Sequence, residues 1–336
     1  MRLDIAGFAR ASRTDSHELM LGLCEKIDRL GFDGIWFNEF HFQNPPQAYP
    51  STLMLASAIF ARTRRLRVGT SIVVTPLYHP YLLAEEVAQL HWQSAGRFDL
   101  GIGRGTHPAT LNSLGIAAET TRDRFEQSYR IMSEAWSTGA IINGGSCWPA
   151  SDIPVGPLLG DESVPVYVAG TSRDTLGFAA REGLPLLLSL DPPEAAQIAT
   201  YRGIIEEEGH GCRLQASSLS RYVCIARTTA LAMAKLDELI PRLHERRLKS
   251  ARAAGRPTDQ ILLPDRQTAM SRQIIAGSPE DCVAQLNALA ESTGIEAVRL
   301  VFNGNGILDM QAAIADMELF AGEVLPVLVR RPVATA

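Results

Sequence analysis

An acid and an imidazole stand two residues apart in the segment Asn38-Glu39-Phe40-His41-Phe42. In an extended chain, residues at this spacing point to the same side. Histidine titrates near neutrality without help, so His41 is a candidate acid, base or hydrogen-bond donor. We place Glu39 in the same catalytic group, as the partner that orients the imidazole. A histidine with a purely structural role is the alternative.

A glycine-rich run, Gly101-Ile102-Gly103-Arg104-Gly105, could approach a flat or anionic ligand closely. The glycines allow close backbone contact, and Arg104 supplies a cation. The run lacks the third glycine and the β-α-β beginning of a dinucleotide fingerprint, which disfavours a nicotinamide site. A tight turn between a strand and a helix would explain the same residues without a ligand.

A second segment, Ala169-Gly170-Thr171-Ser172-Arg173, combines small residues, hydroxyls and free backbone N–H groups at the expected start of a helix. Such an N-terminus can bind phosphate through its free N–H donors and its dipole. Ordinary N-capping by the same hydroxyls is the alternative.

Aromatic residues also gather near the expected strand ends, and a cavity lined by them would suit a flat cofactor and a hydrophobic substrate. They are Phe8, Trp36, Phe37, Phe40, Phe42 and Phe302, of which Phe8, Phe40 and Phe302 are our candidates for a substrate pocket.

Short apolar runs alternate along the chain with longer amphipathic segments, which is typical of parallel strands joined by helices. About eight such units predict an α/β fold, a (β/α)8 TIM barrel with loop insertions, whose active site lies at the carboxyl ends of the strands. The expected strands are Leu3–Ala6, Gly34–Phe37, Leu66–Thr70, Phe98–Ile102, Pro165–Val168, Pro185–Ser189, Ser220–Ile225 and Ala297–Phe302. The expected helices are Ser16–Leu30, Ser51–Ala61, Tyr81–Ser94, Arg122–Ser137, Arg173–Glu182, Glu194–Glu208, Leu231–Arg247, Pro279–Ser292 and Met310–Leu328.

Two stretches interrupt this alternation and are predicted to be loop excursions: Gly139–Val164 and Ser250–Ile275. Loops of this length in a compact domain are usually functional or mobile, so Ser250–Ile275 is a candidate lid over the active site.

The composition is that of a globular protein, with 46% hydrophobic and 21% charged residues among 336, and we expect a single domain over residues 1–336. The net charge of -5 and the lack of a basic run disfavour nucleic acid as a partner. No long apolar stretch predicts a membrane segment or a signal peptide, so we expect a cytoplasmic protein. The five scattered cysteines have no metal-ligand spacing and predict neither disulfides nor a metal site.

The order of these motifs resembles the bacterial luciferase family. Residues 31–42, GFDGIWFNEFHF, are similar to that family's GFDxxWxxEHHF segment, and the runs Pro76-Leu77-Tyr78-His79-Pro80, Gly101 to Gly105 and Gly277-Ser278-Pro279 follow in the same order. The resemblance covers nearly the whole chain. It implies a flavin-dependent monooxygenase that takes reduced FMN from a separate reductase. O2 would add at the flavin C4a carbon, and one oxygen atom would pass to a small, hydrophobic organic substrate.

The resemblance also assigns residues by position. It places Ser71-Ile72 where luciferase has a non-proline cis peptide beneath the isoalloxazine ring. The residues that it places at the flavin or its phosphate are Gly103, Arg104, Arg124, Ala169, Gly170, Thr171 and Ser172.

This chain departs from luciferase at two positions. Phe40 stands where luciferase has its catalytic histidine, and Gly103 replaces its reactive cysteine. These departures argue against light emission and against a long-chain aldehyde as substrate. His41 is the nearest remaining imidazole, and we expect it to hydrogen-bond the oxygenated flavin or a substrate oxygen.

Two other functions stay open. Relatives on the same barrel transfer hydride with the deazaflavin F420 instead of using O2, and a flavin-binding protein without catalysis would also fit the missing histidine. An aldolase is disfavoured because no lysine lies in or just after an expected strand. Related barrels commonly dimerise through helices beside strands two to four, so we also expect a homodimer.

Overall fold

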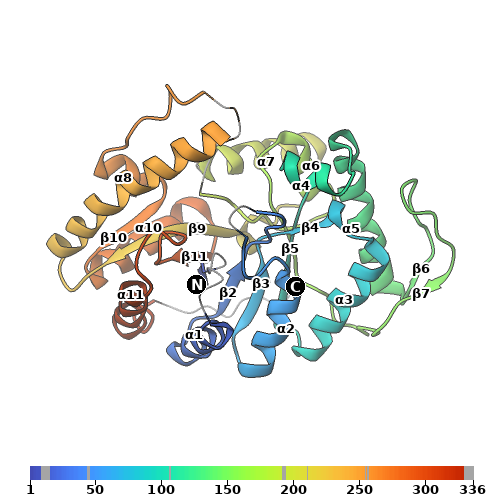
Figure 1. Cartoon of the computed structure of the whole chain (residues 1–336), viewed down its shortest axis with the longest axis horizontal. Helices are drawn as coiled ribbons and strands as arrows, with labels where there is room; N and C mark the ends of the chain where they lie inside the picture. Colours follow the sequence, from blue (N-terminus) through green and yellow to red (C-terminus); the bar gives the residue numbers. More distant parts are fainter. Residues whose placement is uncertain are drawn as a thin grey trace.

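Eight parallel segments pair in a ring in the computed structural model of this chain. Figure 1 shows the helices arranged around the outside of the strands. The structure describes residues 1–8, 16–43, 46–105, 107–190, 194–209, 211–253, 255 and 257–328. Seven of the segments are the strands β1 (Arg2–Ala6), β2 (Gly34–Phe37), β3 (Arg67–Thr70), β5 (Phe98–Gly103), β8 (Val166–Val168), β9 (Ser218–Ile225) and β11 (Ala297–Val301).

The remaining segment, residues 186–188, joins the ring by two single parallel bridges, Val168 to Leu186 and Leu187 to Ser218. Parallel pairings lead from β1 through β2, β3, β5 and β8 to this segment, and through β9 and β11 back to β1. The closed circuit and the helices around it confirm the predicted TIM barrel.

Buried charges fill the amino-terminal half of the barrel interior. Arg2 pairs with Asp4 at 2.9 Å and with Asp99 at 2.6 Å, and Arg67 pairs with Asp99 at 2.7 Å. The Trp36 indole N–H donates to Asp4 at 2.6 Å. Burial raises the pKa of Asp99, but the guanidinium groups of Arg2 and Arg67 outweigh it and hold that pKa below its usual range. The Arg2–Asp99 pair joins β1 to β5, which are not neighbours in the sheet, so this group of charges lies inside the ring.

The helices that follow the strands cover the outside of the barrel. They begin and end close to the predicted positions, because serine side chains cap several starts and glycines in the left-handed conformation end others, as Ser172 and Gly31 do. They are α1 (His17–Leu30), α2 (Thr52–Arg62), α3 (Pro80–Gln93), α5 (Thr121–Thr138), α6 (Arg173–Arg181), α7 (Glu194–Glu208), α10 (Pro279–Thr293) and α11 (Met310–Glu323).

Neither predicted excursion is wholly a loop. The first contains a small antiparallel pair, β6 (Ala140–Ile141) with β7 (Ile153–Pro154). Half of the second is regular: α8 (Thr229–Ala253) runs into it, and α9 (Arg266–Arg272) and β10 (Ile274–Gly277) follow. β10 forms because residues 186–188 bridge the edge of β9 opposite β11 only at Ser218, which leaves residues 222–225 of that edge to pair with β10.

Short elements that were not predicted complete the chain: β4 (Val73–Val74), η1 (Thr75–Leu77), α4 (Pro108–Ser113), η2 (Ala118–Thr120) and η3 (Leu214–Ala216). No helix in the described part of the chain is both long enough and apolar enough to span a bilayer.

Candidate functional site

Four neighbouring strands, β2, β3, β5 and β8, bring most of the predicted site residues to one side of the barrel mouth. Two hydrogen bonds tie their ends together. The Asn38 side-chain amide donates to the Ser71 carbonyl at 2.5 Å. The Ala169 N–H donates to the Ile102 carbonyl at 2.9 Å. The segments after these strands therefore form a continuous arc at the mouth.

Glu39 holds the imidazole of His41 in place. The Glu39 side chain is completely buried, and its carboxylate lies 3.0 Å from His41 Nε2 and accepts a 3.0 Å hydrogen bond from the Tyr78 hydroxyl. The hydrogen bond to Glu39 raises the pKa of His41, while burial raises that of Tyr78. A carboxylate can only accept, so Nε2 carries the proton and Nδ1 is the atom that can take up or release one.

The Ser71-Ile72 peptide bond is cis, as the resemblance predicts. The Ile72 side chain lies against Gly103 of β5, where an added Cβ would come within 2.1 Å of Ile72 Cδ1. A side chain at position 103 would displace Ile72, so the position that the resemblance assigns to a reactive cysteine is filled here from the neighbouring segment.

The start of α6 forms a tight turn at the end of β8. The Ser172 hydroxyl caps the helix by accepting from the Thr175 N–H at 3.3 Å. Gly170 has no room for a side chain, because a Cβ would lie 2.5 Å from Thr175 Cγ2. Thr171 and Ser172 are exposed. The free N–H donors of this helix start lie at the positive end of the helix dipole, which favours a bound anion.

Two predicted arginines, Arg104 and Arg124, form no ion pair within the part of the chain that the structure describes. Arg104 is half-buried and forms no ion pair with any described residue. The Arg124 guanidinium stacks on Trp148 at 5.3 Å, and its Nε is buried without a hydrogen-bond partner in the described part of the chain. Arg122, two residues before Arg124, lies 3.4 Å from Asp174 and so brings the start of α5 next to that of α6. Unpaired cations beside a helix N-terminus fit a phosphate group.

The prediction of Phe302 as a pocket residue is wrong. Side chains alternate along β11, and Phe302 shares the outward face with Leu300, whereas Arg299 points into the barrel. Phe302 packs edge-to-face on Phe32 at 6.2 Å and on Phe320 at 5.5 Å, completely buried. Phe8 is also buried in this apolar cluster, which leaves half-buried Phe40 as the predicted pocket aromatic at the mouth.

Three residues with polar contacts at the mouth were not predicted: Asn38, Tyr78 and Arg299. Tyr78 lies in a quoted motif but far from Glu39 in sequence, so spacing gave no reason to pair them. Arg299 had a detectable signal, because a single charge inside the apolar run Ala297-Val298-Arg299-Leu300-Val301 indicates a polar partner in the barrel interior.

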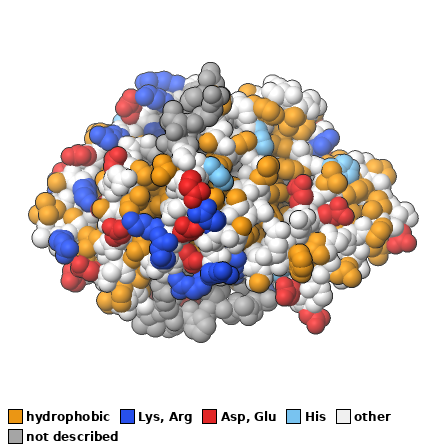
Figure 2. Space-filling model, turned by 60° about the horizontal axis from the view of Figure 1, so that its bottom comes forward, with side chains coloured by type: hydrophobic (Ala, Val, Ile, Leu, Met, Phe, Trp, Pro, Cys, Tyr) orange, Lys and Arg blue, Asp and Glu red, His pale blue; other side chains and the backbone are white. Residues whose placement is uncertain are grey.

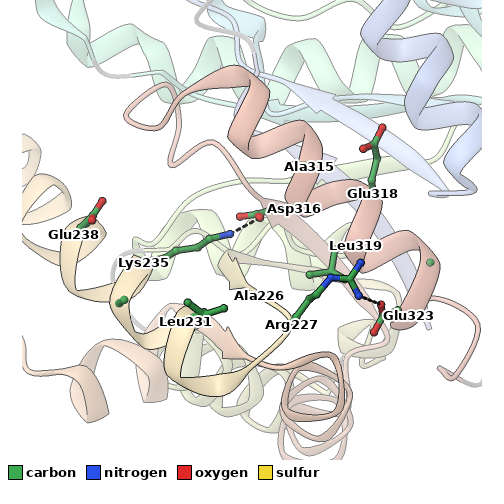
Figure 3. Close-up of a pocket in the computed structure, with 12 residues that line it drawn as sticks. Ala226, Arg227, Leu231, Lys235, Glu238, Ala315, Asp316, Glu318, Leu319 and Glu323 are labelled. Atoms are coloured by element: carbon green, nitrogen blue, oxygen red, sulfur yellow. Dashed lines mark hydrogen bonds and ion pairs between the residues drawn. The ribbon is translucent and has the colours of Figure 1, made fainter.

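A cavity of about 720 Å³ lies elsewhere, between α8 and α11 (Figure 3). Its cations are already paired, Lys235 with Asp316 at 2.5 Å and Arg227 with Glu323 at 3.5 Å. Its lining shares no residue with the mouth, so we do not assign the cofactor to it. Within the described ranges, no three His, Cys, Asp or Glu side chains are placed to hold a metal ion.

The sequence matches the family described as luciferase-like monooxygenase over residues 6–297. The chain belongs to this family. One relative of this luciferase-like monooxygenase is the alkanal monooxygenase alpha chain of Aliivibrio fischeri, 27% identical over 341 residues that cover 94% of this chain and 95% of the relative.

Two solved structures share the fold of this luciferase-like monooxygenase. The oxygenating constituent of 3,6-diketocamphane monooxygenase from Pseudomonas putida, in complex with FMN, has a TM-score of 0.74 at 20% identity, covering 98% of this chain and 100% of that one. The coenzyme F420 dependent tetrahydromethanopterin reductase from Methanopyrus kandleri has a TM-score of 0.66 at 18% identity, covering 97% and 98%.

Proposed function

We propose that this luciferase-like monooxygenase uses reduced FMN and O2 to insert one oxygen atom into a small, hydrophobic organic substrate. The observation that carries the proposal is a pair of cations that make no ion pair with any described residue, Arg104 just after β5 and Arg124 in the first turn of α5. Both segments adjoin the start of α6, because β5 pairs with β8 and Arg122 contacts Asp174. A flavin that ends in a phosphate is the cofactor that these donors fit. The FMN bound to the Pseudomonas putida neighbour supports this choice.

The residues of the mouth would divide the work. Arg104, Arg124 and the N–H groups at Thr171 and Ser172 would bind the phosphate. When bound, the reduced flavin supplies the electrons that activate O2. His41 would give or take a proton at Nδ1, toward the reacting oxygen or the substrate, while Glu39 holds its Nε2.

The remaining positions would shape the cavity. Ser71, Ile72 and Gly103 would support the flavin ring, with Ala169 and Gly170 beside the phosphate, and Phe40 would give the substrate an apolar wall. Together they would keep water away from the reacting oxygen.

An anaerobic titration that compares reduced FMN with reduced riboflavin tests the phosphate site. We expect FMN to bind at least roughly tenfold more tightly, because charged hydrogen bonds to a phosphate contribute about 1.5–3 kcal/mol each. The R104A/R124A double variant should lose most of that difference. The exposed Arg64→Ala variant is the matched control and should keep it. Equal affinity for FMN and riboflavin would rule out the proposed phosphate site.

Oxygen transfer is tested separately by turnover with 18O2, a flavin reductase and candidate hydrophobic substrates. Product that contains 18O supports a monooxygenase. Tight FMN binding without any product over a broad screen would support the catalytically silent flavin-binding protein instead.

A second candidate is favoured by the likeness to the F420-dependent reductase of Methanopyrus kandleri. An F420-dependent hydride-transferring enzyme would bind F420 more tightly than FMN and reduce its substrate without consuming O2. Equilibrium binding of the two cofactors therefore discriminates between the candidates.

We also propose two protein partners. A separate flavin reductase would supply reduced FMN. A second copy of the chain would bind at α2 and α3, where Met54, Leu82 and Trp92 are exposed.

A further inference from the structure

The guanidinium of Arg299 lies in the middle of the barrel, directly below the mouth. It is 4% exposed and donates to four acceptors on three other strand segments: the Ser71 hydroxyl at 3.0 Å, the Leu188 carbonyl at 2.7 Å, and the hydroxyl and carbonyl of Ser218 at 3.1 and 3.3 Å. It also lies 5.7 Å above the centre of the Trp36 ring.

None of these acceptors is charged. The carboxylates of the barrel interior, Asp4 and Asp99, are already bound by Arg2 and Arg67. The described interior thus holds three guanidinium groups and two carboxylates, and Arg299 is the cation without a carboxylate within ion-pair distance. Burial lowers the pKa of Arg299 to about 10, which still leaves it charged at neutral pH.

A buried charge without a counter-ion is costly, and it favours an anion wherever one can approach. The deeper interior is filled by Trp36, Tyr167 and the paired charges. Ser71, just after β3 at the mouth, is half-buried, whereas Leu188 and Ser218 are buried. The anion would therefore approach from the mouth, past Ser71.

Ser71 connects the electrostatic effect of Arg299 to the mouth. Because Arg299 donates to its oxygen, the hydroxyl proton must point away from Arg299, and the Ser71 carbonyl already accepts from Asn38. The hydroxyl is thus a donor with a cation behind it, which strengthens any hydrogen bond that it donates into the mouth.

We infer that Arg299 is a positioning residue that, through Ser71, favours negative charge on the ring of the bound flavin. The inference rests on the proposed function, because it takes the occupant of the mouth to be a flavin. An oxidised isoalloxazine ring is neutral, whereas the reduced ring can lose its N1 proton and carry a negative charge. The protein should therefore bind reduced FMN in preference to oxidised FMN, since nearby charge tunes the cofactor.

The test measures the dissociation constants of oxidised and reduced FMN and the midpoint potential of the bound flavin. In Arg299→Met we expect the preference for reduced FMN to fall roughly tenfold, the effect of removing one nearby charge. This corresponds to a potential about 30 mV more negative for a two-electron couple. Arg299→Lys keeps the charge and should retain most of the preference, while Ser71→Ala should lose part of it.

Arg97 offers a matched control at the opposite end of the barrel. Its guanidinium also donates to neutral acceptors, the Ser94 and Leu66 carbonyls among them, and stacks on Phe60 at 4.9 Å. Arg97→Met removes a comparable partly buried cation far from the mouth, and we expect it to leave the ratio of the two affinities unchanged.

The outcomes separate the two claims. If Arg299→Met does not fold, Ser71→Ala and Arg299→Lys still decide, because both keep the buried cation. If the ratio of the dissociation constants of oxidised and reduced FMN is unchanged in every variant that binds FMN, the role of Arg299 is overturned and the proposed function stands. Failure of the unaltered protein to bind FMN would overturn both.

Discussion

Glu39, His41 and Tyr78 form a hydrogen-bonded chain in which the carboxylate is the middle member. Both outer partners come from segments that lead into the mouth, so the buried acid fixes two loops as well as one imidazole. The raised pKa of His41 extends its protonated form toward neutral pH. This favours His41 as a proton donor in the resting enzyme.

The Glu39→Gln variant tests this arrangement. The pKa of His41 should fall, because the hydrogen bond to the Glu39 carboxylate is the largest cause of its increase. An NMR titration of the imidazole proton on Cε1 measures it directly. Tyr78→Phe is the control, since it removes a hydrogen bond to Glu39 but keeps the carboxylate, and it should leave the pKa of His41 raised.

The sign of the stability change follows from the same shift. The stabilisation that comes from a raised folded-state pKa is fully present below the unfolded pKa of about 6.5. It is lost as pH rises through the folded-state pKa. The unaltered protein should therefore lose this contribution on going from acidic to alkaline pH, and Glu39→Gln should not. An unchanged imidazole titration in Glu39→Gln would show that another group sets the pKa of His41.

Hydrogen-bonded pairs at the mouth were predictable from spacing only where sequence neighbours act together. Glu39 and His41 could be paired because they are two residues apart. Tyr78 and Arg299 could not, because each meets its partner through strand order and the closing of the ring, which spacing along the chain does not encode. Phe302 was assigned to the wrong face of the sheet, because a shift of one residue along a strand moves a side chain to the opposite face.

Strands β3 and β5 approach each other unusually closely just before the mouth. The Thr70 hydroxyl exchanges hydrogen bonds with the Gly101 backbone, both at 2.9 Å, and a Cβ on Gly101 would lie 2.0 Å from the Thr70 carbonyl oxygen. This contact positions Ser71, the next residue in the chain, so the glycine is part of how the mouth is built.

Gly101→Ala should lower the free energy of unfolding by roughly 1–3 kcal/mol, because the atom that it meets is backbone and cannot rotate away. Urea denaturation measures the change. Gly203→Ala in α7 is the control: no atom lies within 4 Å of its added Cβ, and alanine favours a helix interior by about 0.5–1 kcal/mol. A Gly101→Ala protein as stable as the unaltered one would mean that the two strands can separate freely.

Among the elements, buried strands and amphipathic helices were predicted well because each carries its own apolar pattern and capping residues. β10 was missed because four residues become a strand only when the long β9 offers an edge. α8 was predicted too short. It begins at Thr229 and continues to Ala253, and Ala251 in the part that was missed is buried. The predicted part already held Leu236, Leu239, Ile240 and Leu243, which pack onto β9 and β10.

Helices α2 and α3 lie side by side, joined by a 2.9 Å hydrogen bond from the Gln93 amide to the Ser57 hydroxyl. They present Met54 and Trp92 to solvent, 77% and 67% exposed. These helices are in the lower part of Figure 1, and hydrophobic side chains appear among charged ones where that side comes forward in Figure 2. Together with the dimerisation that the family resemblance implies, these exposed side chains favour the proposed homodimer.

Sedimentation velocity should therefore show a dimer at micromolar concentration. The M54E/W92E variant should shift the protein toward monomer, because two charges would be buried in the interface. Leu262, 78% exposed in the segment after α8, provides the control, and Leu262→Glu should leave the dimer intact. A monomeric unaltered protein would contradict the proposal.

The ring of strands is not equally strong all the way round. Residues 186–188 are joined to each neighbour by one bridge, whereas β9 and β11 are paired over five residues. Arg299 reaches across this thin seam, with one nitrogen on the Leu188 carbonyl and on that of Ser218. The Arg299 guanidinium, which contacts the mouth through Ser71, therefore also strengthens the join between residues 186–188 and β9. A bound molecule that moves Arg299 toward the mouth will therefore disturb the weakest join of the barrel. Occupancy of the mouth and closure of the ring are coupled through this one side chain.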